Sequence, residues 1–172
     1  MSVIKAYKNL ESSNRFLIAF LFWLLVLFGL FYWGKYWSYS PIGEYLDKSI
    51  RSLIMPILNI IVDNPIVGYD IVINPKYRVL ITPECNGLIP FLMIAAAIIA
   101  YPCNLLRKIK WLIFSFVMFF VMNILRLYIV VLVVSKFGSS YFYLVHDVGG
   151  NILLILTGAL LFLPYLKGCN EE

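Results

Sequence analysis

The amino-acid sequence predicts an all-α polytopic membrane protein, with about four transmembrane helices, an outer amphipathic helix and a short β-hairpin. Its composition indicates the membrane, because 62% of the 172 residues are hydrophobic, 13% are charged and the mean hydropathy is +0.89. Soluble domains are about 45–50% apolar and about 25% charged. Long apolar stretches and grouped basic residues support the same class. We expect a single membrane-embedded domain over residues 1–172.

Four stretches are apolar over nearly the length that a bilayer requires, which is roughly 20 residues and at least about 17. They cover residues 16–33, 87–102, 111–134 and 148–166. The second is short but free of charge, and the third contains Asn123 and Arg126. The first could also be a cleavable signal peptide. We predict a retained anchor, because its apolar core exceeds the usual length of about 7–15 residues and no small-residue cleavage site follows.

Basic residues near the ends of these stretches predict the orientation, since they favour the cytoplasmic side. One basic group precedes the first span, one lies between the second and third spans, and one follows the fourth. A chain that starts inside and crosses a cell membrane four times therefore has all three groups and both termini in the cytoplasm. Residues 34–86 then lie outside. The net charge of +5 is explained by this bias and by anionic lipid, without a nucleic-acid partner. The groups are Lys5, Lys8 and Arg15; Arg107, Lys108 and Lys110; and Lys167.

An amphipathic helix is predicted to begin at Ser40 and Pro41, a helix-start signal, and to lie in the membrane interface. Its apolar piece at 53–62 contains Pro56 and is short for a span. If that piece crossed, the basic loop at 107–110 would face outward, against the positive-inside bias. Whether it enters the membrane is left open. The helical pattern comprises Ile42, Tyr45, Leu46, Ile50, Leu53, Ile54, Ile57, Leu58 and Ile61, with the charge pairs Glu44/Lys48 and Asp47/Arg51.

A short hairpin is predicted in "YDIVINPKYRVLIT", where two β-rich runs meet at a turn over residues 74–76. The hairpin leads into "TPECNGLIP", in which Asn86 and Gly87 open the second span and Pro90 occupies its first turn. Cys85 is therefore expected at the positive end of a helix dipole. That position lowers the pKa of a thiol.

The three cysteines separate by side of the membrane. Cys103 and Cys169 are expected at the cytoplasmic face, which leaves Cys85 alone on the outer face without a disulfide partner. Three cysteines also make a disulfide framework improbable. The alternative reading of Cys85 is an unpaired thiol that only fills space.

Two polar side chains stand inside the third span. A charge there costs at least about 2.5–3.5 kcal/mol and indicates a functional residue. Arg126 lies eight residues before Val134, or about 12 Å from the expected outer end. Asn123 is three positions earlier and shares its face, so both can line a polar cavity. The alternative is a structural arginine that binds backbone carbonyls or lipid phosphate.

His146 is the one histidine of the chain and stands in "YLVHDVGGN", at the outer mouth of the fourth span. Histidine has an ordinary pKa of about 6.5, which suits general acid–base chemistry. Asp147 is positioned to orient the ring or to cap the following helix, and Gly149 and Gly150 allow backbones to approach closely. The alternative is a solvated loop histidine.

A thiol, a guanidinium and an imidazole are thus predicted at one face of the membrane, from three different spans. A cysteine nucleophile requires a base or cation to form its thiolate, an acid for the leaving amine, and donors for an oxyanion. Cys85, His146 and Arg126 can meet these needs. One histidine and scattered cysteines do not form a tetrahedral metal site, and we expect neither metal nor cofactor.

The motifs resemble the exosortase/archaeosortase family of membrane transpeptidases. The resemblance rests on "ECNG" opening a span, "NILR" within a span and a histidine heading the next, over about residues 72–166. It implies a catalytic set of Cys85, Arg126 and His146. From their places in the sequence, we expect Asn86, Gly87, Asn123 and Asp147 to be substrate-binding or supporting residues. About four spans, against about eight in larger members, make the chain similar to the short, single-module members.

The resemblance also implies the substrates. They are membrane-anchored proteins that end in a short motif, one transmembrane helix and a basic tail, cut near the outer face. The acyl acceptor, a lipid, a glycan or water, is left open. The competing hypothesis is a non-enzymatic membrane component or small transporter that binds a polar ligand at Asn123 and Arg126. Against it, the sequence shows neither an internal repeat nor mid-depth charges on several spans.

Overall fold

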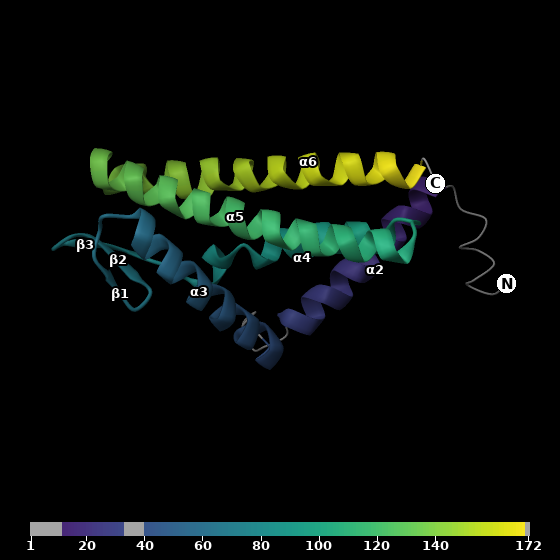
Figure 1. Ribbon diagram of the computed structural model, residues 1–172, viewed down its shortest axis with the longest axis horizontal. Coiled ribbons are helices and arrows are strands. Elements are labelled where there is room, and N and C mark those ends of the chain that lie inside the picture. Colours follow the sequence, from purple (N-terminus) through teal and green to yellow (C-terminus); the bar gives the residue numbers. More distant parts are fainter. Residues whose placement is uncertain (1–11, 33–39, 171–172) are drawn as a thin grey trace.

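The computed structural model describes residues 12–32 and 40–170. Helices α5 and α6 lie along the long axis with α4 beside them (Figure 1). Helices α2 and α3 form a V on one side, and a small sheet lies at the end far from both termini. The elements are α2 (Ser12–Phe31), α3 (Pro41–Ile61), β1 (Ile66–Val67), β2 (Asp70–Asn74), β3 (Tyr77–Leu80), the 3-10 turn η1 (Pro83–Asn86), α4 (Leu88–Ala100), α5 (Leu105–Phe137), the 3-10 turn η2 (Ser139–Tyr141), the π-helical turn η3 (Leu144–Gly149) and α6 (Gly150–Asn170).

Three helical segments are long and apolar enough to cross a membrane: Ser13–Phe31, Leu105–Phe137 and Ser139–Cys169. The expected second span is the shorter α4, with 13 residues, or about 20 Å. These elements confirm a mostly helical multi-pass membrane fold. The expected third span, 111–134, is part of α5, which is longer at both ends and runs from Leu105 to Phe137. Helix α5 also packs against α3 and β2. Trp33, Lys5 and Lys8 lie outside the described residues.

The predicted amphipathic helix is α3, and it begins where the sequence indicated. Ser40 is its N-cap and accepts a hydrogen bond from Gly43 N at 3.0 Å, while Pro41 is the first helical residue. One face is buried in the protein, with Ile54 and Leu58 at 0% exposure. Other apolar side chains of α3 stay exposed, Ile60 most of all. The helix is therefore amphipathic, with apolar groups left over for lipid.

The β segment differs from the predicted hairpin by one strand. Strands β2 and β3 form the expected antiparallel pair, and β1 adds to the free edge of β2 to give the order β1-β2-β3. Gly68 makes the tight β1–β2 turn with φ +66°. A two-residue strand is too short to show alternation of apolar and polar residues, which is why the sequence did not reveal β1.

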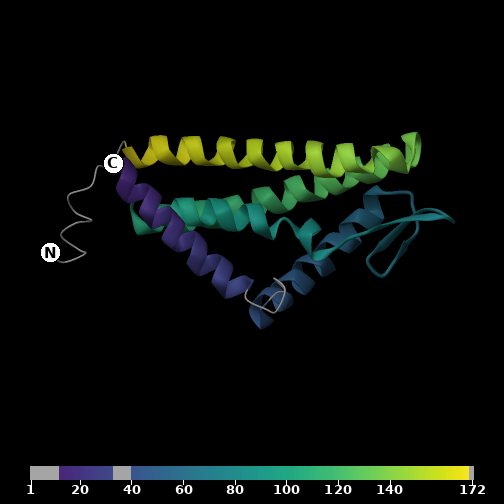
Figure 2. The ribbon, with the colours of Figure 1, turned by 180° about the vertical axis from the view of Figure 1, so that it is seen from behind.

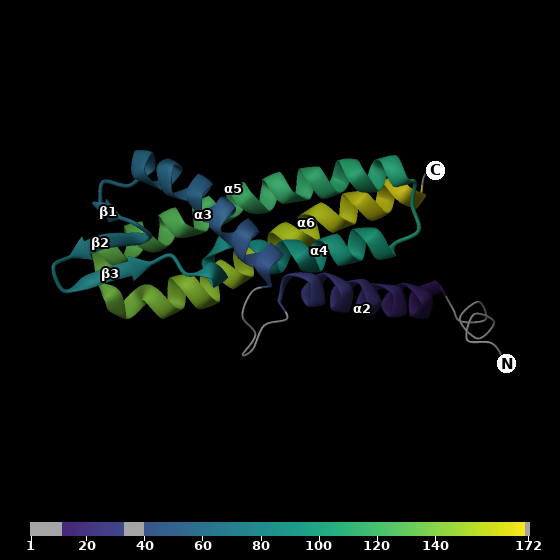
Figure 3. The same cartoon turned by 90° about the horizontal axis from the view of Figure 1, so that it is seen from below.

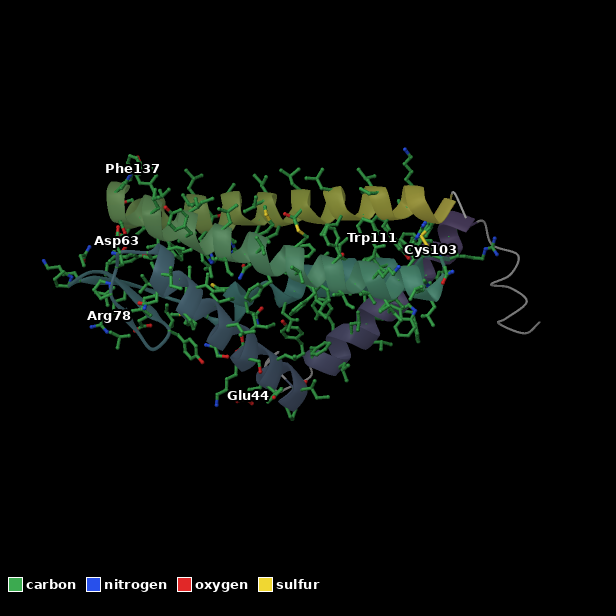
Figure 4. All side chains as sticks on the ribbon, viewed as in Figure 1. Glu44, Asp63, Arg78, Cys103, Trp111 and Phe137 are labelled. Atoms are coloured by element: carbon green, nitrogen blue, oxygen red, sulfur yellow. A yellow bond between two sulfur atoms is a disulfide. The ribbon has the colours of Figure 1, made fainter. Side chains whose placement is uncertain are left out.

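A disulfide joins Cys103 to Cys169, a bond that the sequence analysis did not predict, and Cys85 is a free thiol as expected. Helices α4 and α6 both run from the site toward the termini, and their C-terminal ends lie side by side (Figures 1 and 2). This parallel course brings together two thiols that stand 66 residues apart. Cys103 lies at one end of the molecule and Phe137, the last residue of α5, at the other (Figure 4).

Candidate active site

Cys85 and His146 are in direct contact, although 61 residues separate them. Cys85 Sγ lies 3.3 Å from His146 Nε2 and 3.3 Å from Thr82 Oγ1. The thiol belongs to η1, a short turn between β3 and α4, and is 5% exposed. The sequence placed Cys85 just ahead of a helix opened by Asn86 and Gly87, at the positive end of its dipole. Here α4 begins three residues later, at Leu88, with Gly87 as its N-cap.

His146 lies in the π-helical turn η3, which continues directly into α6. Its Nδ1 lies 3.0 Å from Asp147 Oδ1, and its ring stacks on Phe142 with centroids 4.9 Å apart. A carboxylate only accepts hydrogen bonds, so Nδ1 donates to Asp147 and Nε2 faces the thiol. π-helical turns are rare in proteins, and those that occur are often found at functional sites. Here the turn, Asp147 and Phe142 together fix the imidazole.

Arg126 of α5 contacts the same ring nitrogen of His146 as Cys85 does. Its Nη2 lies 3.3 Å from His146 Nε2 and donates to the His146 carbonyl oxygen at 3.2 Å. Arg126 is 5% exposed, and its buried Nε makes no hydrogen bond to any described residue. Gly150, the first residue of α6, leaves the room that the guanidinium occupies.

Asn123 fixes the backbone of the cysteine turn. Its Nδ2 donates to the Cys85 carbonyl oxygen at 2.6 Å, and the side chain is 0% exposed. Gly87 permits this contact for two reasons. Its φ is +76°, and a β-carbon there would lie 3.2 Å from Asn123 Cβ. Asn123, which the sequence linked to Arg126, therefore positions Cys85 directly.

A second anchor comes from α3, through Asn86. Asn86 Nδ2 donates to Asp47 Oδ1 at 2.8 Å, and Asn86 Oδ1 accepts from Leu88 N at 2.7 Å. Asp47 is 2% exposed, and Arg51 Nε donates to both of its carboxylate oxygens at 3.1 and 3.0 Å. Arg51 also lies over the ring of Tyr69, 4.3 Å from the centroid. The amphipathic helix thus holds the residue next to Cys85.

The surroundings of Cys85 favour the thiolate. Burial raises the pKa of the Cys85 thiol, but hydrogen bonds to His146 and Thr82 and the charge of His146 outweigh burial and bring the pKa below its ordinary value. A low thiol pKa distinguishes reactive cysteines from those that only pack. Cys85 is also the one free thiol in the described part of the chain.

The sequence model of the family described as transmembrane exosortase matches residues 7–163. The chain belongs to the transmembrane exosortase family. It is similar to the probable archaeosortase E of Methanocaldococcus jannaschii, with 29% identity over 153 residues that cover 88% of this chain and 77% of that protein. No solved structure matches the chain significantly.

In this exosortase-family chain, the structure gathers every candidate residue of the sequence analysis at one place: Cys85, Asn86, Gly87, Asn123, Arg126, His146 and Asp147. Sequence reasoning missed Thr82, Asp47 and Phe142 as neighbours of the site. In the sequence, Asp47 has the spacing of a surface ion pair with Arg51, four residues later, and nothing distinguishes Thr82 from other loop residues. The i−4 spacing of Phe142 and His146 was the one available signal for the ring stack.

The site of this exosortase-family protein opens into a groove of about 680 Å³. Arg126, His146, Asp147 and Asn151 form its polar end, and apolar side chains of α2, α4, α5 and α6 form the rest. Within residues 12–32 and 40–170, no group of three or more His, Cys, Asp or Glu residues is arranged to hold a metal ion.

Proposed function

We propose that this chain is a membrane cysteine transpeptidase or protease that cleaves C-terminal sorting signals of exported proteins. The supporting observation is the contact of Cys85 Sγ with His146 Nε2, beside Arg126. Membership of the exosortase family, whose members are cysteine transpeptidases, supports the same reaction. The catalytic residues we propose are Cys85 as nucleophile, His146 as acid and base, and Arg126 as the cation that stabilises developing negative charge.

In the acylation step, the thiol proton passes to His146 Nε2, and Sγ attacks the carbonyl carbon of the scissile amide. The oxygen of the tetrahedral intermediate takes a negative charge, and Arg126 is the described cation nearest to the imidazole. When the C–N bond breaks, His146 returns its proton to the leaving amine. A thioester on Cys85 and a free amine are the products.

In the deacylation step, the acceptor loses a proton to His146 and attacks the thioester, and the proton then returns to Cys85. A hydroxyl or amine of a lipid or glycan gives transfer, and water gives hydrolysis. Asp147 keeps the ring in the tautomer that presents Nε2 in both steps.

We place this chemistry at the outer face of a cell membrane, with both termini in the cytoplasm. Helix α4 is about 20 Å long, and Cys85 precedes it by three residues. If Ala100 lies at the inner boundary of a hydrocarbon core of about 30 Å, the thiol lies about 7 Å inside the outer boundary. The outer third of α5, the sheet and part of α3 then stand beyond the core. An amide that directly precedes a transmembrane helix lies within about one to two helical turns of this depth.

The test is the acyl-enzyme. The chain is expressed with a same-genome protein that ends in a motif, one transmembrane helix and a basic tail, and the size of that protein is followed on gels. We expect a hydroxylamine-sensitive thioester at Cys85. Cys85→Ala abolishes cleavage, and Cys85→Ser nearly does, because a hydroxyl does not form a low-pKa anion. Full maturation in the Cys85→Ala strain, with no other peptidase responsible, favours the membrane-component hypothesis.

That competing hypothesis assigns Asn123 and Arg126 to a polar ligand. In the structure Asn123 Nδ2 already binds the Cys85 carbonyl, and Arg126 binds His146. Asn123 Nδ2 and Arg126 Nη2 thus bind candidate catalytic residues, although Asn123 Oδ1 and Arg126 Nε have no described partner. The contacts therefore favour the enzyme.

A further inference from the structure

The groove next to the site is bounded by four helices. Helices α4 and α6 form its walls, Phe119 and Arg126 of α5 form its floor, and Phe20 of α2 closes one side. Asn151 and Ile155, which line it on α6, are exposed, as is Met93 on α4. The groove is therefore open along its length, toward the region that lipid occupies around a membrane protein.

The groove is closed at its inner end and wide at the site. The ring of Phe16 on α2 packs against Phe162 of α6 with centroids 6.2 Å apart, and against Tyr101 at 5.9 Å. From there α2 slants away from α6 toward its C-terminal end (Figures 1 and 2). Seen from below, α4 lies between α2 and the pair α5 and α6 (Figure 3). Helices α2 and α6 therefore diverge in the direction of His146.

The groove has the dimensions of a seat for part of a helix. Its lining extends from Ile89 to Ala97 on α4 and from His146 to Gly158 on α6, about 12–18 Å at 1.5 Å per residue. A volume of about 680 Å³ over that length gives a mean cross-section of about 45 Å². A helix of about 10 Å diameter has a cross-section of about 80 Å². An open groove of this size seats roughly half of it, over two to three turns.

The residues at the bottom allow close approach of another helix. Ala97 of α4 and Gly158 of α6 both line the groove, and small residues are the ones at which membrane helices pack most closely. A β-carbon at Gly158 would meet Phe119 and Ile94 only at ordinary contact distances of 3.7 and 3.8 Å. Gly158 therefore leaves space in the groove, although neither its backbone conformation nor its close neighbours require a glycine at this position.

The position of the leaving amine in the proposed reaction indicates which molecule binds in the groove. Arg126 and His146 line the groove, and Cys85, whose Sγ contacts His146 Nε2, does not. In the proposed reaction His146 protonates the leaving amine, and that amine is the N-terminus of the segment that contains the transmembrane helix of the sorting signal. The leaving segment must therefore pass beside His146 Nε2, and the groove, which Arg126 and His146 line and Cys85 does not, is the apolar space next to that nitrogen.

We propose that the groove binds the transmembrane helix of the protein substrate, with its N-terminal end at Arg126 and His146. This inference rests on the proposed function for the identity of the substrate. Apolar side chains pack against the helix, and the polar end of the groove receives the amide just before it. The exposed acyl part of the substrate lies toward Cys85.

Photo-crosslinking tests the position of the helix separately from catalysis. Benzoylphenylalanine is placed at Ile155 or Met93, which line the groove, and at Leu160, an exposed α6 residue outside it. Each is placed in the Cys85→Ala background, and the probe is a reporter ending in the motif, helix and tail of a same-genome protein. We expect reporter crosslinks from Ile155 and Met93 at least tenfold above those from Leu160. The crosslinked peptide should contain the reporter's transmembrane helix.

The outcomes separate the two proposals. Crosslinks to the helix without any Cys85-dependent cleavage by the unsubstituted chain uphold the groove and overturn the enzyme. Cys85-dependent cleavage with equal crosslinking from Ile155 and Leu160 overturns the groove and leaves the enzyme. Crosslinks from Ile155 and Met93 that contain lipid only, with reporter present, identify a lipid site and also overturn the inference.

Gly158→Leu fills the groove, and Ala159→Leu is its matched control on the adjacent exposed position. We expect Gly158→Leu to lower reporter crosslinking and processing at least tenfold, and Ala159→Leu to change them less than twofold. Alkylation of Cys85 by a small reagent should be the same in both variants, which shows that the site itself is intact. Equal processing by the two variants contradicts the inference.

Discussion

Gly150 lies against the guanidinium of Arg126, with no room for a side chain at that position. A β-carbon at 150 would overlap Arg126 Nε and lie 3.0 Å from Cδ and 3.1 Å from Cζ. Its neighbour Gly149 has only the Leu144 carbonyl oxygen near it, at 3.5 Å from such a β-carbon. The two adjacent glycines thus differ in what they do. Gly150 gives Arg126 its place beside His146.

We predict that Gly150→Ala impairs the reaction and Gly149→Ala does not. The added methyl displaces Arg126 from His146, and overpacking of this kind costs about 1–3 kcal/mol. Processing of a tail-bearing reporter should fall at least tenfold in Gly150→Ala and stay within twofold in Gly149→Ala. Membrane levels of both variants serve as the control. Equal activity of the two variants would show that the position of Arg126 is unimportant.

Lysine should be a poor substitute for Arg126 despite its equal charge. Arg126 Nη2 contacts both the ring nitrogen and the carbonyl oxygen of His146, and its Nε is a further donor with no described partner. A lysine that made the same two contacts with its one nitrogen would have no second donor nitrogen for an oxyanion. We expect Arg126→Lys to lower turnover by orders of magnitude while the protein still inserts into the membrane at an unchanged level. Near-normal processing would assign Arg126 a structural role only.

The Cys85 thiol should react at lower pH than an ordinary thiol. Its pKa is lowered because the contacts with His146 and Thr82 outweigh burial, so the thiolate fraction at neutral pH is increased. Alkylation by iodoacetamide should rise with pH, with a midpoint below the ordinary value of about 8.5. In His146→Gln burial still raises the pKa, and the midpoint should move upward. A midpoint that is equal in both proteins contradicts the assigned role of His146.

Much of this arrangement could be predicted from residue types that are rare in an apolar chain. A charge inside a span, a lone histidine and a cysteine at the mouth of a span each stood out, and the structure brings Cys85, Arg126 and His146 into one cluster. The start of α3 was predicted because Ser40 and Pro41 are local signals. Such features depend on a few neighbouring residues and are visible in the sequence.

The remaining features depend on how distant elements pack. The Cys103–Cys169 disulfide follows from the parallel course of α4 and α6, and no local pattern records that course. Asp47 has the same spacing to Arg51 as any surface ion pair, yet it is buried against Asn86. Burial of one side of a helix is decided by its partner elements, so the role of Asp47 could not be read from spacing.

The Asp47–Asn86 contact should position Cys85. Asn86→Asp puts a second carboxylate beside Asp47, and we expect processing and Cys85 alkylation to fall at least tenfold through repulsion in a buried place. The double variant Asp47→Asn with Asn86→Asp restores one donor facing one acceptor and should recover at least threefold. Glu44→Asn, at an exposed position on the same helix (Figure 4), is the control and should have no effect. A double variant that recovers nothing contradicts a direct positioning role.

The last prediction concerns the side of the membrane. Single cysteines replace Lys76 in the β2–β3 turn, Lys110 at the start of α5 or Lys167 near the end of α6, in a background without the native cysteines. An impermeant maleimide added to spheroplasts should label position 76 at once, and positions 110 and 167 only after lysis, because basic residues favour the cytoplasmic side. The described helix α3 is not among the segments long and apolar enough to span. If residues 53–62 crossed, all three labelling results would reverse, and Cys85 would lie on the cytoplasmic side, away from the sorting signals of exported proteins.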